Sequence, residues 1–78
     1  MRNLYTIAAE IKNDWKNVNY AAKPYLEAMT EITSIHDKYY EDTAAAVVMY
    51  FLANAGGWRG ETAKRIKAEL NAQLKTTE

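Results

Sequence analysis

Apolar residues recur along this chain at the spacing of α-helices, and no stretch of useful length shows the alternation of a β-strand. The first predicted helix extends from about Leu4 to Trp15, behind a capping Asn3. One apolar stripe runs along it: Leu4, Ile7, Ala8, Ile11 and Trp15. A turn at residues 16–19, which holds two asparagines, is expected to follow the helix.

The second predicted helix begins between Tyr20 and Pro24, because proline is tolerated in a first helical turn, where its missing N–H is not needed. It ends near Thr33 or Ser34. The side chains on its apolar side are Leu26, Met29 and Ile32. The stretch 34–42 is predicted to be a loop or a short additional helical turn.

The third predicted helix starts at Asp42 or Thr43, both suitable caps, and continues to about Ala55. Its sequence AAAVVMYFLA is apolar on nearly every side, so we expect it to be the central and most buried element. Gly56 or Gly57 is expected to supply the left-handed exit from this helix.

The fourth predicted helix runs from about Trp58 to Leu74, with its basic residues outward. Its inward residues are Trp58, Ala63, Ile66, Leu70 and Leu74. Together the segments predict an all-α fold, a compact bundle of about four helices with a central apolar third helix. No linker or repeat interrupts the chain, so residues 1–78 are expected to form a single helical domain.

The length of 78 residues sets a limit on stability, because a domain of this size buries only about 60% of the surface of its unfolded chain. Six Tyr, two Trp and one Phe can fill the core with large side chains. Dimerisation is the other common route to stability at this length, so a homodimer stays open.

The chain has no cysteine, which excludes disulfides and cysteine-based zinc sites and agrees with a reducing cytoplasm. Its longest uncharged stretch, Thr43–Trp58, is interrupted by Asn54 and two glycines and is shorter than the roughly 20 apolar residues of a membrane span. We therefore expect a cytoplasmic protein without a membrane partner.

The formal net charge is zero, but the charges are unevenly distributed. Acidic residues dominate from Glu27 to Asp42, and basic residues dominate from Trp58 to Lys75. The molecule is therefore expected to have an acidic middle and a basic C-terminal helix.

No residue pattern in the chain indicates a metal site or a cofactor. His36 is the sole histidine, and a zinc site takes three or four protein ligands. Asp37, Glu41 and Asp42 do not have the spacing of a calcium-binding loop. We expect no metal and no cofactor.

Catalytic signatures are equally scarce. The carboxylate pairs Glu10 with Asp14 and Glu27 with Glu31 each lie one helical turn apart, but nothing indicates a pocket that would separate their pKa values. There is no nucleophile elbow, phosphate loop or dinucleotide fingerprint. The sequence therefore predicts that the protein is not an enzyme.

Two kinds of surface remain as candidates for binding a partner. Tyrosine is enriched at binding hot spots, and the adjacent Tyr39 and Tyr40 cannot both point into the core, although tyrosines also border small cores without any function. The third and fourth helices, with small residues around their turn, also fit a helix-turn-helix. In that reading four side chains face DNA: Arg59, Lys64, Arg65 and Lys67.

Three segments resemble small uncharacterised helical proteins encoded by phages and prophages of Gram-positive bacteria. These segments are Ile7–Trp15 (IAAEIKNDW), Pro24–Met29 (PYLEAM) and Tyr50–Leu70 (YFLANAGGWRGETAKRIKAEL). The resemblance implies a compact protein that acts in a bacterial host cytoplasm by binding, as some phage proteins block host defences such as CRISPR. It brings no established activity, so no functional residue is transferred from it.

The function expected from these observations is that of a non-enzymatic phage-type accessory protein, of which an anti-CRISPR-like inhibitor of host defence is one version. It binds a host or phage protein through Tyr39, Tyr40 and the charged face of the fourth helix. The alternative is a DNA-binding regulator that uses the basic C-terminal helix in a helix-turn-helix.

Overall fold

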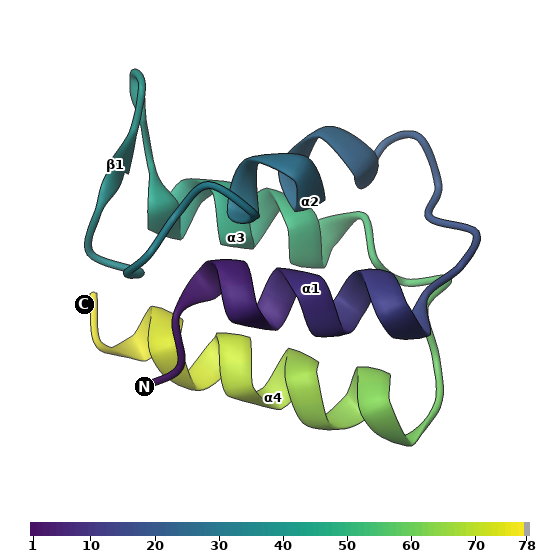
Figure 1. The fold of residues 1–78 in the computed structure, drawn as a ribbon. Helices are drawn as coiled ribbons and strands as arrows, with labels where there is room; N and C mark the ends of the chain where they lie inside the picture. The colour runs from purple at the N-terminus through teal and green to yellow at the C-terminus, as the bar shows by residue number, and fades with distance from the viewer. Residues whose placement is uncertain (78) are drawn as a thin grey trace.

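Four helices and a short β-hairpin make up the secondary structure of residues 1–77, the part of the chain that the computed structural model describes (Figure 1). The helices are α1 (Leu4–Asp14), α2 (Lys23–Met29), α3 (Ala44–Ala53) and α4 (Glu61–Lys75). The hairpin pairs β1 (Lys38–Tyr39) with β2 (Asp42–Thr43) in antiparallel register. The fold is mostly helical, as predicted, but the small sheet distinguishes it from a pure all-α bundle.

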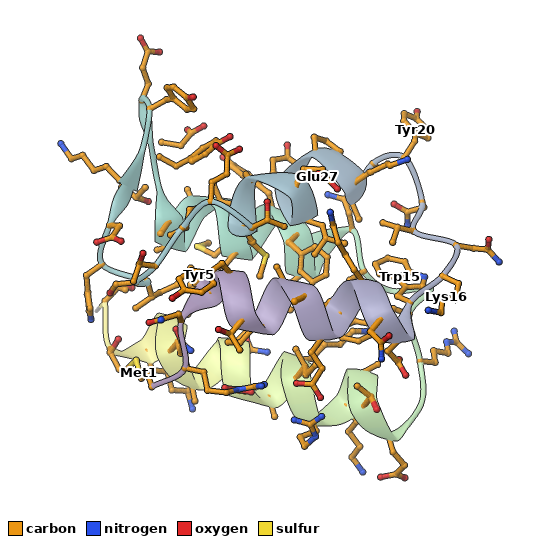
Figure 2. All side chains as sticks on the ribbon, viewed as in Figure 1. Met1, Tyr5, Trp15, Lys16, Tyr20 and Glu27 are labelled. Atoms are coloured by element: carbon orange, nitrogen blue, oxygen red, sulfur yellow. The ribbon has the colours of Figure 1, made fainter. Side chains whose placement is uncertain are left out.

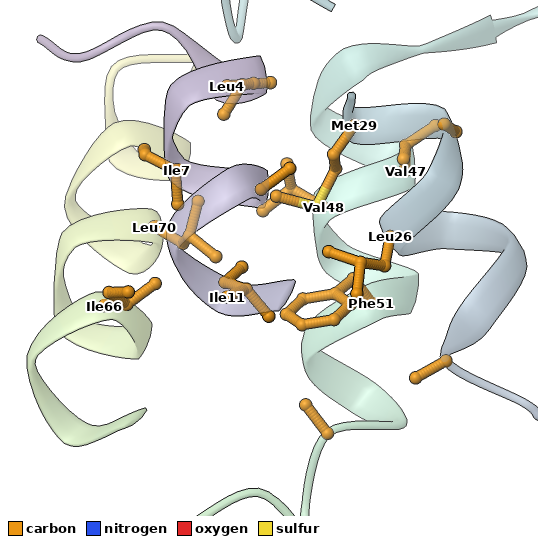
Figure 3. Packing of buried hydrophobic residues seen from close by; sticks show 14 of the residues in the cluster. Leu4, Ile7, Ile11, Leu26, Met29, Val47, Val48, Phe51, Ile66 and Leu70 are labelled. Carbon is orange, nitrogen blue, oxygen red and sulfur yellow. The ribbon is translucent and has the colours of Figure 1, made fainter. Parts of the chain in front are cut away.

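Each helix packs chiefly against two neighbours, so that the four helices follow one another around a common core in the order α1, α2, α3, α4. Figure 3 shows this core, with Ile11 of α1, Leu70 of α4 and Phe51 of α3 turned toward its middle. The apolar stripe predicted for the first helix is buried throughout, from Leu4 to Trp15. The periodicity of the sequence therefore identified the inward side of α1 correctly.

The third helix is central, as expected, because α3 packs against α2, α4 and β2, but it is not buried on every side. Val48 and Phe51 of α3 are fully buried, but Met49 and Tyr50 remain 58% and 52% exposed. The reason is geometric, because each helix in a four-membered ring keeps a side that no other helix covers. A helix that is apolar all round must then present apolar side chains to solvent.

The second helix is shorter at its carboxyl end than the sequence predicts, because α2 stops at Met29. The carbonyl oxygens of Ile32 and Thr33 accept hydrogen bonds from the first N–H groups of α1, at Tyr5 (3.0 Å) and Leu4 (2.9 Å). These N–H groups have no partner within their own helix. The segment after α2 thus caps α1 instead of extending α2.

The stretch 34–42, predicted to be a loop or a helical turn, contains the hairpin. Its second strand leads directly into α3, and the predicted cap Thr43 is confirmed because its Oγ1 accepts a hydrogen bond from the N–H of Ala46 (3.0 Å). The predicted cap Asn3 occupies the right position, but its side chain donates to the Tyr5 hydroxyl and accepts no hydrogen bond from a helix N–H. The hairpin was missed because each strand has only two residues.

Trp58 lies in the connection between α3 and α4, since α4 begins at Glu61 and not at Trp58. Its ring is only 2% exposed and stacks on Trp15 at 5.8 Å between ring centroids, with an angle of 9° between the planes. The rings of Trp58 and Phe51 meet edge to face with 6.4 Å between their centroids, and the indole N–H of Trp58 donates to the Asp14 carboxylate at 2.8 Å. Trp58 therefore joins the ends of α1 and α3 to the start of α4.

We predict that Trp58→Ala lowers the free energy of unfolding by about 3–5 kcal/mol, because it empties a large buried volume. Trp58→Phe keeps much of the apolar area and loses the bond to Asp14, so its loss should be smaller. Urea denaturation of both variants measures the difference. A loss below about 1 kcal/mol for Trp58→Ala would contradict the burial of the ring.

Gly60, not Gly56 or Gly57, is the glycine with a positive φ angle. At φ 114° and ψ −179° it occupies a backbone region that is essentially restricted to glycine, directly before α4. The carboxyl end of α3 needs no left-handed residue, because Asn54 follows it at φ −109°. The predicted left-handed exit after the third helix is therefore wrong.

Alanine substitutions test whether Gly60 differs from Gly56 and Gly57 in its need for a positive φ angle. Gly60→Ala should destabilise the fold by about 1–3 kcal/mol through backbone strain alone, because no atom lies within 4 Å of an added Cβ. Gly56→Ala and Gly57→Ala are matched controls with equally open surroundings and no positive φ, so their effect should be neutral or slightly stabilising. Thermal melting compares the three, and equal effects would refute the assignment.

Candidate functional site

The residues predicted to bind a partner lie in two separate places. Tyr39 and Tyr40 belong to the hairpin, next to the start of α3, and the basic residues belong to the opposite end of the molecule, where α4 begins (Figure 1). The fold therefore does not combine them into one binding surface, and each group is described by itself.

The hairpin holds Tyr40 in an exposed and unusual conformation. Tyr40 is the first of the two loop residues between the paired Tyr39 and Asp42, and its φ angle is 57°. Glycine is the preferred residue for a positive φ at this place in a tight turn, and another residue costs about 1–2 kcal/mol there. The side chain is nevertheless a large aromatic ring that is 83% exposed.

The ring of Tyr39 contacts the ring of Tyr40. It packs against the core, and the two tyrosine rings meet edge to face at 4.7 Å between centroids. Its hydroxyl donates to the Glu31 carboxylate at 3.2 Å. Partial burial raises the pKa of the Tyr39 hydroxyl, and Glu31 raises it further, so the hydroxyl remains a donor. Tyr39 is thus an anchor, and Tyr40 is the side chain that is presented.

The surroundings of the hairpin are acidic, in agreement with the charge distribution in the sequence. Four carboxylates and one lysine lie on it or beside it: Glu31, Asp37, Glu41, Asp42 and Lys38. Asp37 also holds the preceding turn, because its Oδ2 accepts a hydrogen bond from the N–H of Ser34 at 2.9 Å. A ligand that touches Tyr40 therefore meets negative charge around it.

Arg65, one of the bases predicted to face DNA, forms part of an ion-pair network between α1 and α4. Its guanidinium donates to the Glu10 carboxylate, which also accepts from Arg2 at 2.8 Å. Arg2 binds Glu69 with two further hydrogen bonds, of 2.8 and 2.6 Å. This paired geometry fixes the amino-terminal segment against α4.

Lys67, a second predicted base, also has a role within the fold. Its ammonium donates to the carbonyl oxygen of Trp58 at 2.6 Å and lies 5.8 Å from the centroid of that ring. Arg59 and Lys64 are exposed and take part in none of the four ion pairs found within residues 1–77. Of the four bases expected on the binding face, two are therefore engaged elsewhere.

The ion-pair network lowers the pKa of both carboxyl groups in it. Hydrogen bonds from Arg65 and then Arg2 lower the pKa of Glu10 below its ordinary value near 4.5, and the bond from Arg2 does the same for Glu69. A carboxylate with a lowered pKa in the folded state stabilises that state while it is ionised. This contribution is complete above about pH 4.5 and is lost as the pH falls through the lowered values.

We therefore predict that Arg2→Met reduces the dependence of stability on pH in the acidic range. The free energy of unfolding, measured in urea from about pH 7 to about pH 3, should fall less steeply for this variant than for the wild type. Lys64→Met removes a charge on α4 that takes part in none of the ion pairs of residues 1–77, and it should leave the slope unchanged. An Arg2→Met slope equal to that of the wild type would disprove the assignment.

The candidates for metal or acid–base chemistry do not come together. Within residues 1–77 no three metal-ligating side chains of the His, Cys, Asp and Glu types converge. His36 lies beside Thr76 at the end of α4, with 3.4 Å between Nε2 and Oγ1. The carboxylates of the two predicted pairs contact different partners: Asp14 binds Trp58, and Glu27 binds Lys12.

The outer face of α3 is a surface that the sequence reasoning did not identify. Met49 and Tyr50 lie exposed on it, and an open groove of about 590 Å³ separates it from α4, with Leu52 and Leu74 among its walls. The signal was present in the run AAAVVMYFLA, which is apolar on every side. A run of this kind predicts burial, but it also describes an uncovered apolar face.

No helix within residues 1–77 is long and apolar enough to cross a membrane. No protein-family model, curated protein or solved structure matches this chain.

Proposed function

We propose that this chain is a non-enzymatic binding protein that engages a protein partner through the hairpin, with Tyr40 as the central contact. One observation carries the proposal: a large aromatic ring, 83% exposed, occupies a backbone position with φ 57° where glycine would fit better. Folding gains little from this ring, whose one aromatic contact within residues 1–77 is with Tyr39. Strain that folding does not explain is characteristic of functional positions.

The chemistry of the partner follows from the surroundings of Tyr40. A tyrosine ring contributes to binding when a pocket takes it out of water, and its hydroxyl then forms a hydrogen bond within that pocket. The acidic residues beside the ring, such as Glu41 and Asp42, favour a positively charged rim around such a pocket. We infer a partner with an apolar pocket bordered by lysine or arginine.

The biological setting is proposed from the resemblance described above. Blocking a basic nucleic-acid-binding surface of a host defence complex is one form of such binding, since acidic residues around an aromatic contact suit a surface of that charge. The support for this setting consists of the three quoted segments and the acidic hairpin.

Affinity capture tests the role of Tyr40. The tagged protein is incubated with bacterial lysate, and the partner identified by mass spectrometry is then titrated with purified variants. Tyr40→Ala should weaken its affinity by well over 1 kcal/mol, which corresponds to more than about fivefold in Kd. Tyr20→Ala is the matched control, because Tyr20 is 90% exposed, far from the hairpin (Figure 2), and should leave the affinity unchanged.

Tyr40→Gly distinguishes binding from stability. Both Tyr40→Gly and Tyr40→Ala remove the ring, but glycine also relieves the strain at φ 57°, so it should be about 1 kcal/mol more stable than the alanine variant. It should bind the partner no better than alanine does. Unchanged affinity in both variants would remove Tyr40 from the interface and refute the proposed function.

DNA binding is the second candidate function, and the exposed Arg59 and Lys64 favour it. They line an open depression at the start of α4 together with Gly60. The connection between α3 and α4 spans residues 54–60, which is longer than the usual turn of about 3–4 residues in a helix-turn-helix. Capture of nuclease-sensitive nucleic acid that depends on Arg59 and Lys64 and is lost in salt would favour this candidate over the hairpin.

A further inference from the structure

The uncovered face of α3 has a regular composition. Ala46, Met49, Tyr50 and Ala53 follow one another at the spacing that places residues on one side of a helix. On the other side of α3, the side chains point into the core: Val47, Val48 and Phe51 (Figure 3). No charged residue occurs between Asp42 and Arg59, so covering this face would not remove any charged side chain of α3 from water.

We propose that this face is the interface of a symmetric dimer, in which α3 packs antiparallel against α3 of a second copy of the chain. The arrangement of residues along the face is the same in both directions: small, large, large, small. A twofold axis between positions 49 and 50 therefore places Ala46 against the partner's Ala53 and Met49 against the partner's Tyr50. Such an isologous contact requires a surface that is complementary to itself, and this face has that property.

The sizes of these side chains suit close packing of two helices. The alanines at both ends let the backbones approach, and the two large side chains in the middle fill the space around the axis. Ring contact with Tyr25 of α2, at 5.4 Å between centroids, holds Tyr50 in place. The groove beside Met49 adds Leu52 and Leu74 to the apolar area that a second copy would cover, and its α4 side also carries Asn71 and Lys75.

The charges at the two ends of α3 support the antiparallel direction. Glu41 and Asp42 precede the helix, whereas Arg59 is the first charged residue after it. Lys23 is also near that second end, because Asn19, four residues before it, donates to the Asn54 carbonyl at 2.9 Å. A twofold axis brings the acidic end of one copy to the basic end of the other, and it also aligns the helix dipoles favourably.

This interface is independent of the proposed use of the hairpin and adds to it. Because each hairpin lies beyond the amino end of its α3, the antiparallel dimer presents its two Tyr40 side chains at opposite ends. A partner that carries two copies of the binding site can therefore be bound by both Tyr40 side chains at once. This bivalent binding is stronger without any additional kind of contact.

Sedimentation equilibrium across a wide range of concentrations is the first test. The wild-type chain, of 8.9 kDa, should change from monomer to twice that mass as concentration rises. Met49→Glu introduces a charge beside the axis and should weaken self-association at least about tenfold. Tyr20→Glu places the same new charge on a residue that is 90% exposed and lies outside this face, so it should dimerise like the wild type.

Disulfide trapping tests the direction of packing, since the chain has no cysteine of its own. A mixture of tagged Ala46→Cys and untagged Ala53→Cys chains should form a mixed cross-linked dimer on oxidation. Either variant alone should not, because antiparallel packing separates its two cysteines by about 10 Å along the helix, beyond the reach of a disulfide. Cross-linking of each variant with itself and no mixed product would overturn the antiparallel arrangement.

A wild type that stays monomeric up to millimolar concentration would overturn the dimer. So would an unchanged monomer–dimer equilibrium in a folded Met49→Glu variant. Circular dichroism confirms that the variant is folded, and the cross-linking experiment decides the question if it is not. Neither result affects the hairpin proposal, because capture through Tyr40 is measured separately.

Discussion

The structure depends first on the burial of Trp58, a side chain that reaches the core from a connecting segment. Its ring stacks on Trp15 and meets the edge of Phe51, while its indole N–H binds Asp14 and its carbonyl accepts from Lys67. One residue thereby joins the end of α1, the end of α3 and the first turns of α4. A domain this small has few other large side chains with which to close that end of the core.

The opposite end is closed by polar contacts. Arg2 connects Glu10 of α1 with Glu69 of α4, and the buried Gln73 donates to the Arg2 carbonyl at 3.1 Å. With both ends fixed, four short helices enclose one core, and each has an outward side. In α3 that outward side is apolar. The ring arrangement that encloses the core therefore also leaves an apolar surface uncovered.

The two surfaces that we assign to binding have different physical origins. The face of α3 is exposed because the ring of helices cannot cover it, and a second copy would remove it from water. Tyr40 is exposed because the hairpin directs it outward at a strained backbone position, although glycine would satisfy the turn. Helix packing explains why the face of α3 is exposed, but it does not explain why Tyr40 is exposed. The basic residues of α4 are a weaker candidate, because Arg65 and Lys67 already have partners within the fold.

The sequence by itself determined that four helices form and which sides of α1, α2 and α4 face inward, because the 3.6-residue periodicity of apolar residues depends on local geometry and needs no knowledge of the partners. It also located the start of α2 at Pro24 and the cap of α3 at Thr43, and it predicted that Tyr39 and Tyr40 could not both be buried. Only the tertiary structure decided which side of α3 is covered, since its composition is apolar in every direction. It likewise decided that Gly60 carries the positive φ, which depends on how the connection from α3 enters α4, and that Arg65 is ion-paired, which depends on how α1 and α4 meet.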